Sequence, residues 1–280
     1  MIIQEHGDHL LLIRQTEHAV LSGFFAREWG NEHFARPEPF ASFCLAAAEH
    51  DNGWREWELQ PQLDLKTRLP YSFTSIPTEQ HITLYQRGIE RLIKENHYAG
   101  LLVSMHCAGL YDRTRATMPG FSAKYIKANE TQLANDFVQR LKLQQLRLKV
   151  DLRANPDMKS FAEEKMLQAN SQRLEALDRL SLYFCLAPLE GSTIDQVPVD
   201  NQGGETGWDL RPERGNVVAL APYPFRRDSL EFSIMARRIP KRVYDDDLDF
   251  QKTLAHAPYF AKKFTLHDAG EREQSRAGAA

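Results

Sequence analysis

The sequence lacks the features that mark several protein classes. It has no run of about 18 consecutive apolar residues, so we predict no membrane-spanning helix. The formal net charge is only −3, which leaves no global basic field for duplex nucleic acid or an anionic membrane. The three cysteines are odd in number and far apart, as expected of reduced thiols. The first residues also lack the basic start of a secretory signal, so we expect a cytoplasmic protein.

Hydrophobic residues make up 42% of the 280 positions, which is enough for one large folded domain. Helical spacing of apolar residues dominates from residue 14 to residue 187. After Pro188, glycines separate short strand-like runs, and residues 1–13 form a hairpin pattern around His6-Gly7-Asp8. We therefore predict a mainly α fold. It consists of a helical bundle over about residues 14–187, a small antiparallel sheet from residues 1–13 and 195–266, and a disordered tail at 269–280.

The stretch LAAAEHDNGW, residues 45–54, places His50 and Asp51 at the end of an apolar helix. Such a pair can cap a helix, because an imidazole can hydrogen-bond to the last free carbonyl groups. It can also bind a metal if further ligands lie nearby in the fold. The local sequence leaves both interpretations open.

Further residues of metal-binding type occur within other apolar helical patterns. They are His18, His81, His106 and Asp178. Asp178 lies within LEALDRLSLYF, and an aspartate in such a run is seldom buried unless it is paired or binds a cation. Helical bundles form metal sites by directing such side chains from several helices toward one interior point. These residues are therefore candidate ligands together with His50 and Asp51.

In this order the residues resemble the HD-domain superfamily of metal-dependent phosphohydrolases, and they suggest a bacterial branch of unknown function. The superfamily has a histidine on one helix, a His-Asp pair at the end of the next, and an aspartate on a late helix. Members with two metals add two histidines between the pair and the last aspartate. The resemblance covers about residues 14–187 and implies an HD-type bundle. It implies one metal held by His18, His50, Asp51 and Asp178, and a second held by His81 and His106, with Asp51 as the bridge.

The resemblance implies that water activated by two divalent ions hydrolyses a phosphomonoester or phosphodiester. Nucleotides are among the substrates that this reaction allows. Candidate ions are Mn, Mg, Fe, Zn and Ni. His50 and Asp51 are the expected catalytic groups. Arg113 is the expected phosphate-binding cation, chosen from basic residues near the ligands: Arg55, Arg68, Arg113, Arg115 and Lys124. Cys107 follows His106 where the cyclic-dinucleotide phosphodiesterases have a second histidine, which argues against that substrate.

Two alternatives to the phosphohydrolase are compatible with the sequence. The first is an HD-type di-iron oxygenase, which uses the same residues to bind two irons. The second is a non-catalytic ligand-binding or regulatory protein. The ligand order does not separate hydrolase from oxygenase, and the sequence leaves the oligomeric state open. Metal content and activity toward phosphate esters distinguish the three.

Overall fold

The computed structural model describes residues 1–111, 126, 128–186 and 188–270. The longer helices of this part of the chain are α1 (Gln15–Glu28), α2 (Phe40–Glu49), α4 (Thr78–Glu95), α5 (His97–Leu110), α6 (Thr131–Ala154) and α7 (Glu164–Cys185). Helix α8 (Asp247–His256) follows near the C-terminal end, and shorter helical segments are η1 (Asn52–Trp54), α3 (Arg55–Leu59) and η4 (Ala128–Glu130). The strands are β1 (Ile2–His6), β2 (His9–Ile13), β3 (Ser192–Pro198), β4 (Glu205–Pro212), β5 (Val217–Ala221), β6 (Ser229–Pro240) and β7 (Tyr259–Asp268).

The strands form one seven-stranded sheet in the order β1-β2-β6-β7-β5-β4-β3. The predicted N-terminal hairpin is present, and Gly7 supplies the positive φ of 59° that its turn requires. The hairpin joins the C-terminal strands through antiparallel pairing of β2 with β6. β5 and β7 pair in parallel, whereas the other neighbouring strands pair antiparallel. The sheet is therefore mixed and joins the two ends of the chain.

The predicted mainly α fold with a small antiparallel sheet is wrong, because the sheet is large and mixed. The sequence pattern did not reveal β3, β4 and β7, because charged and other polar residues interrupt the apolar ones and leave no long apolar run. The segment 241–245 lies within the range predicted for the sheet, residues 195–266, but it is not a strand and leads into α8. Of the predicted tail, residues 271–280 lie outside the described part of the chain.

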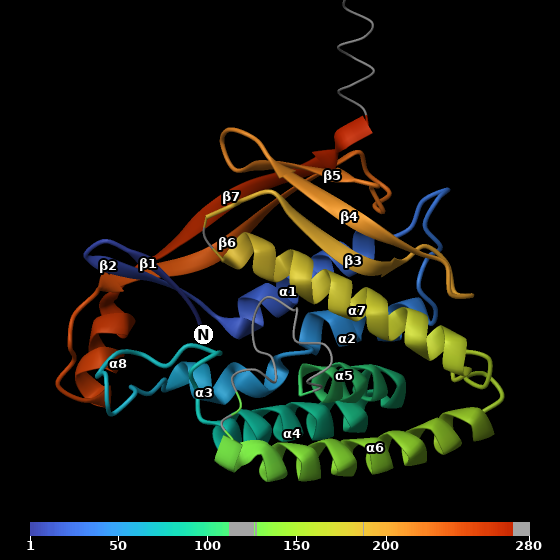
Figure 1. Cartoon of the computed structure of the whole chain (residues 1–280), viewed down its shortest axis with the longest axis horizontal. Helices are drawn as coiled ribbons and strands as arrows, with labels where there is room; N and C mark the ends of the chain where they lie inside the picture. Colours follow the sequence, from blue (N-terminus) through green and yellow to red (C-terminus); the bar gives the residue numbers. More distant parts are fainter. Residues whose placement is uncertain (112–125, 127, 187, 271–280) are drawn as a thin grey trace, which may run out of the picture.

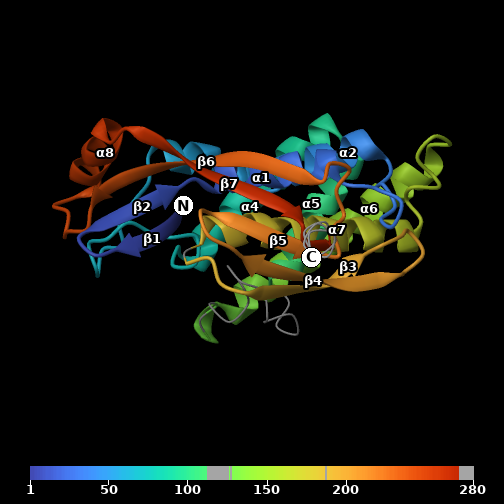
Figure 2. The ribbon, with the colours of Figure 1, turned by 90° about the horizontal axis from the view of Figure 1, so that it is seen from above.

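The sheet lies over the helices, with α1 and α7 directly beneath it (Figure 1). Helices α2 and α5 form the next level, and α4 and α6 lie farthest from the sheet. Seen from above, the strands cover the helical layer and α8 lies at the end nearest β1 and β2 (Figure 2). Aromatic contacts connect the two layers, because Phe184 of α7 packs edge-on against Phe232 of β6 at a ring-centroid distance of 4.9 Å. One continuous hydrophobic core therefore joins sheet and helices.

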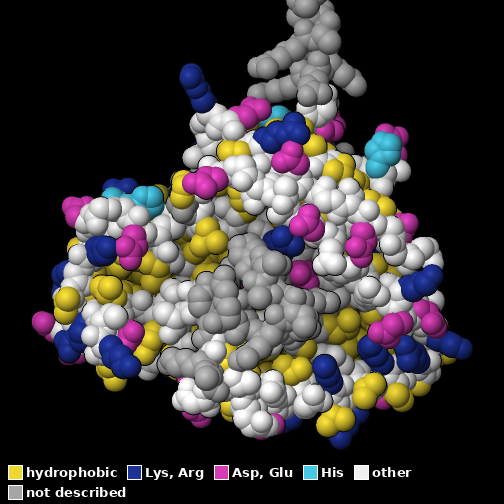
Figure 3. All heavy atoms as spheres, in the orientation of Figure 1, with side chains coloured by type: hydrophobic (Ala, Val, Ile, Leu, Met, Phe, Trp, Pro, Cys, Tyr) yellow, Lys and Arg dark blue, Asp and Glu magenta, His cyan; other side chains and the backbone are white. Residues whose placement is uncertain are grey.

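Helix α6 forms the outer wall of the helical layer. Its inner side buries Phe137, Leu141 and Leu148, whereas Leu146 and Val150 remain exposed. Figure 3 shows hydrophobic side chains among the charged ones along this lower edge of the molecule. The candidate ligands come from α1, α4, α5 and α7 and from the segment directly after α2.

Candidate metal centre

The apolar helix α2 ends in the segment that carries His50 and Asp51. His50 keeps helical dihedral angles, and its Nδ1 donates to the carbonyl oxygen of Ala47 at 2.9 Å. This is the capping contact that the sequence allowed, and it leaves Nε2 free to act as a ligand atom. Nε2 is buried and has no hydrogen-bond partner among the described residues. A buried polar atom without a partner is costly, and a metal ion would satisfy it.

The two residues after Asp51 hold this segment against α4. The Asn52 side chain donates to the carbonyl oxygens of Glu49 and Gly88 at 2.7 and 3.2 Å. Gly53 lies so close to α4 that an added Cβ would be 1.9 Å from the carbonyl oxygen of Leu84. Glycine is required here because only a residue without a side chain permits this approach. These contacts fix the chain direction immediately after the candidate ligands.

Candidate ligands from α1, α5 and α7 converge on this segment. His18 Nε2 of α1 lies 2.8 Å from Asp51 Oδ2. Asp178 Oδ1 of α7 lies 3.4 Å from His50 Nε2, and its Oδ2 lies 3.9 Å from Nε2 of His106 on α5. All five side chains are buried, and none is more than 6% exposed. The structure thus brings together five of the six ligands predicted from the sequence.

These atoms form two overlapping groups with metal-binding potential, His18–His50–Asp51 and His50–His106–Asp178. Both groups contain His50, which has only Nε2 available because Nδ1 is hydrogen-bonded. One imidazole nitrogen binds one ion, so an ion at His50 Nε2 would draw its other ligands from either group or from both. Ligand bonds of about 2.0–2.2 Å place neighbouring ligand atoms roughly 3–3.5 Å apart in a coordination sphere. The 3.4 Å between His50 Nε2 and Asp178 Oδ1 lies in this range. The 2.8 Å between His18 and Asp51 is shorter, and the two distances of 3.9 Å are longer, so an ion would require small shifts of these side chains.

The electrostatics of the cluster also favour a bound cation. Burial would lower the pKa of His50, but Asp51 and Asp178 outweigh it and raise that pKa to about 9. Burial would raise the pKa values of both carboxylates, yet His50 and its neighbours hold them below their usual range. Burial lowers the pKa of His106 to about 4, which keeps this imidazole neutral at pH 7. At pH 7 the metal-free cluster therefore holds a protonated His50 between two ionised carboxylates, and a divalent ion would displace that proton and take over its positive charge.

Several groups that orient the ligands were not found from the sequence. Asp51 Oδ1 accepts from the hydroxyl of Tyr85 at 2.6 Å, and its Oδ2 accepts from Gln15 Nε2 at 3.0 Å. His18 Nδ1 lies 2.9 Å from Ser181 Oγ, whose hydroxyl donates to the carbonyl oxygen of Asp178. His18 Nδ1–H therefore donates to Ser181, and Nε2 faces the cluster. Such partners hold metal ligands in place. No sequence pattern distinguishes Gln15, Tyr85 and Ser181 from other polar residues of helices.

His81, the sixth predicted ligand, belongs to neither group of potential ligands among the described residues. It is buried, its Nδ1 lies 2.6 Å from the Tyr111 hydroxyl, and its ring lies 4.7 Å from that of Tyr85. Burial lowers its pKa to about 3, so it is neutral at pH 7. His81 thus lies behind Tyr85, one side chain away from Asp51.

The predicted basic residues do not gather at the cluster. Arg55 forms an ion pair with Glu49 at the surface, and Arg68 donates to the carbonyl oxygen of Tyr244. Arg113, Arg115 and Lys124 lie outside the described residues. Among the described residues, the metal centre therefore consists of histidine and aspartate with polar neutral partners.

Comparison with known proteins identifies the family. Residues 1–241 match the family described as "Protein of unknown function (DUF3891)". The chain belongs to the DUF3891 family. The match spans both the helical layer with its metal-type cluster and most of the sheet. No curated protein and no solved structure matches the chain significantly. Within the described part of this DUF3891 protein, no helix is both long and apolar enough to cross a membrane.

Proposed function

We propose that this protein is a metal-dependent phosphohydrolase that acts on a small phosphate ester, with a nucleotide among the possible substrates. The observation that carries the proposal is the convergence of five buried ligands around His50 Nε2, which has no other partner among the described residues. The order of these ligands in the chain resembles that of the HD-domain phosphohydrolases. The proposed partner is the phosphate ester itself.

The chain offers one divalent ion the ligands His18, His50, Asp51, His106 and Asp178. When bound, such an ion lowers the pKa of water and neutralises negative charge on a phosphoryl group. Asp51 accepts hydrogen bonds on both oxygens, from Tyr85 on Oδ1 and from Gln15 on Oδ2, so we assign it a positioning and ligand role. Asp178 has fewer hydrogen-bond donors around it. We assign Asp178 the role of general base, which accepts the proton of the attacking water.

The one-ion arrangement favours hydrolase over oxygenase. A di-iron oxygenase requires a complete second ligand set, and His81 lies outside the groups formed by the described residues. Tyr85 also occupies Asp51 Oδ1, the atom that a bridging carboxylate would offer to a second ion. We therefore propose one ion rather than two. Manganese, magnesium, zinc, nickel and iron remain the candidates, because nitrogen and oxygen ligands of this kind bind several of them.

Metal content and turnover test the proposal together. The full-length protein is purified without chelator or metal-affinity tag, and its metals are measured. It is then assayed with p-nitrophenyl phosphate and bis-p-nitrophenyl phosphate in the presence of each candidate ion. We expect about one ion per chain and release of p-nitrophenol that Asp178→Asn lowers at least about 100-fold. Glu49→Gln, which alters a nearby surface carboxylate, should keep the activity.

Two outcomes would overturn the hydrolase. Two irons per chain with oxygen consumption and no phosphate-ester cleavage would support the oxygenase. One tightly bound ion with no turnover of a broad panel of phosphomonoesters and phosphodiesters would support the non-catalytic alternative. In that case the metal would serve to join the helices.

A further inference from the structure

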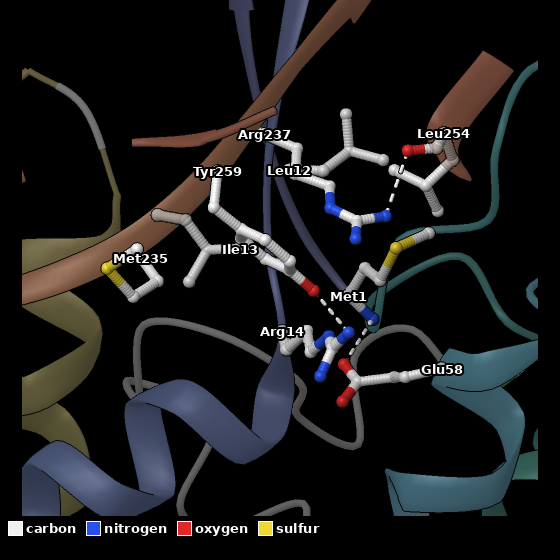
Figure 4. A pocket seen from close by; sticks show the side chains of 9 residues that line it. All are labelled: Met1, Leu12, Ile13, Arg14, Glu58, Met235, Arg237, Leu254 and Tyr259. Atoms are coloured by element: carbon white, nitrogen blue, oxygen red, sulfur yellow. Dashed lines mark hydrogen bonds and ion pairs between the residues drawn. The ribbon is translucent and has the colours of Figure 1, made fainter. Parts of the chain in front are cut away.

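A pocket lies outside the metal centre, between the sheet, α3 and α8 (Figure 4). About 320 Å³ of atom-free space, its open mouth included, lies among the lining side chains. Because this figure includes open solvent at the mouth, the enclosed part of the pocket is much smaller and admits only a compact group. The polar wall contains Arg14, Arg237 and Tyr259, whereas Leu12 and Met235 contribute to the apolar wall. The pocket thus combines charged and apolar surfaces.

Strand register places part of this wall in one row. Leu12 of β2 pairs with Arg237 of β6, which pairs with Tyr259 of β7. Directly opposed residues of antiparallel strands point to the same face of a sheet, so these three side chains lie side by side. The Arg237 guanidinium lies 3.9 Å from the Tyr259 ring centroid, and its Nη1 donates to the carbonyl oxygen of Leu254 at 2.8 Å. These contacts fix the guanidinium in place.

The two arginines retain hydrogen-bond donors for a ligand. The buried Nε of Arg237 has no hydrogen-bond partner among the described residues. Arg14 lies where β2 meets α1, and its Nη2 donates to the Tyr259 hydroxyl. Tyr259 therefore holds both guanidinium groups beside one space. An arginine presents five donors, so both side chains keep N–H groups beyond these contacts.

The pocket carries excess positive charge. Glu58 is the one acidic side chain among the described residues that line it. Its carboxylate accepts hydrogen bonds from the main-chain N–H groups of Gln15 and Thr16, and it lies 3.7 Å from the amino nitrogen of Met1. No ion pair within 4 Å joins Glu58 to Arg14 or Arg237 in the described structure. Among the described residues, Glu58 therefore pairs with neither guanidinium group, while Glu17 lies near enough to Arg14 for their charges to interact.

We propose that this pocket binds the anionic group of a small organic acid, a carboxylate or a phosphate, between Arg14 and Arg237. Guanidinium groups match both anions through paired N–H donors. The apolar wall receives a short hydrocarbon stem of the same molecule. The pocket lies beside the metal centre, because Gln15 donates to Glu58 through its main chain and to Asp51 through its side chain. The proposal does not depend on phosphate-ester hydrolysis.

Calorimetric titration of the metal-free full-length protein tests this site. Chelator treatment and dialysis remove metal, so the metal centre does not contribute to anion binding. The probes are inorganic phosphate and butyrate, which distinguish the two anion types. We expect saturable binding of at least one probe at one site per chain, weakened at least about tenfold in Arg14→Gln and in Arg237→Gln.

Arg238→Gln is the matched control. Arg238 follows Arg237 on β6, and adjacent strand residues point to opposite faces of a sheet. Its exposed side chain does not line the pocket, so its loss should leave binding unchanged. Arg14→Gln keeps the test valid if Arg237→Gln fails to fold, because Arg14 is half-exposed. The absence of saturable binding of both probes would overturn the proposal, and so would equal weakening in the control and the two test variants.

Discussion

Replacing Asp51 with asparagine tests the metal centre at its most connected ligand. Oδ2 of Asp51 lies 2.8 Å from His18 Nε2 and 3.0 Å from Gln15 Nε2, while Oδ1 accepts from Tyr85. Asparagine keeps the shape but removes the negative charge, and its amide NH₂ would face a donor if it were turned toward Gln15 Nε2. We expect Asp51→Asn to weaken metal binding at least about 100-fold, because even partners outside the ligand set contribute 10–100-fold.

The size of the effect follows from linkage between binding and folding. An ion present at about 100 times its Kd stabilises the folded chain by about 2.7 kcal/mol if it binds only that state. For a chain of 280 residues, this corresponds to a rise in Tm of roughly 5–10 °C, since 1 kcal/mol shifts Tm by about 2–4 °C in domains of nearly this size. A 100-fold weaker site at the same metal concentration gives about 0.4 kcal/mol. The metal-dependent rise in Tm should therefore nearly disappear in Asp51→Asn.

The assay is thermal unfolding followed by circular dichroism, with and without each candidate ion, together with metal analysis. Glu49→Gln is the control, because Glu49 lies two residues from Asp51 and its carboxylate pairs with Arg55 at the surface, 2.6 Å away. An exposed pair of this kind contributes at most about 1 kcal/mol, so this variant should keep the metal-dependent rise. The assignment of the centre would be refuted if Asp51→Asn gained the same Tm from metal as the unaltered protein.

Four further predictions follow from the surroundings of the centre. Tyr85→Phe should keep the fold but weaken metal binding by about 10–100-fold in a competition titration; unchanged affinity would exclude a positioning role for its hydroxyl. The variant His81→Ala should keep about one ion per chain in metal analysis. Loss of that ion would show that His81 contributes to metal binding, as the two-metal interpretation requires. Gly53→Ala should lower the free energy of unfolding, measured in urea, by roughly 3 kcal/mol or more, because the alanine Cβ would lie 1.9 Å from a main-chain oxygen. An unchanged urea midpoint would contradict this close approach. Burial raises the pKa of the Cys44 thiol to about 11, so only about 0.1% of it is thiolate at pH 8. We expect this thiol to react with Ellman's reagent at pH 8 only after unfolding. Rapid reaction in the folded protein would show that the thiol is exposed.

Local sequence patterns were sufficient where the structure depends on short-range periodicity. The helices over residues 78–95 and 97–110 follow apolar spacing, and the first hairpin follows from its glycine turn. The sheet was underestimated because its pairings are distant in the chain. β2 pairs with β6 more than 220 residues later, and no local signal encodes that partner. Polar residues that interrupt the apolar ones in β3 and β7 further obscure these strands in the sequence.

The sequence alone determined which residue types are available for a metal, and their order brought His18, His50, Asp51, His106 and Asp178 into consideration together. Only the tertiary structure decided that these five meet while His81 stays behind Tyr85. The physical reason is that helix packing decides which face of each helix points inward. A shift of a few ångströms in a side chain decides whether it reaches the ion or only packs nearby. The same packing selected Tyr85 and Gln15 as partners of Asp51, and strand register placed Arg237 beside Tyr259.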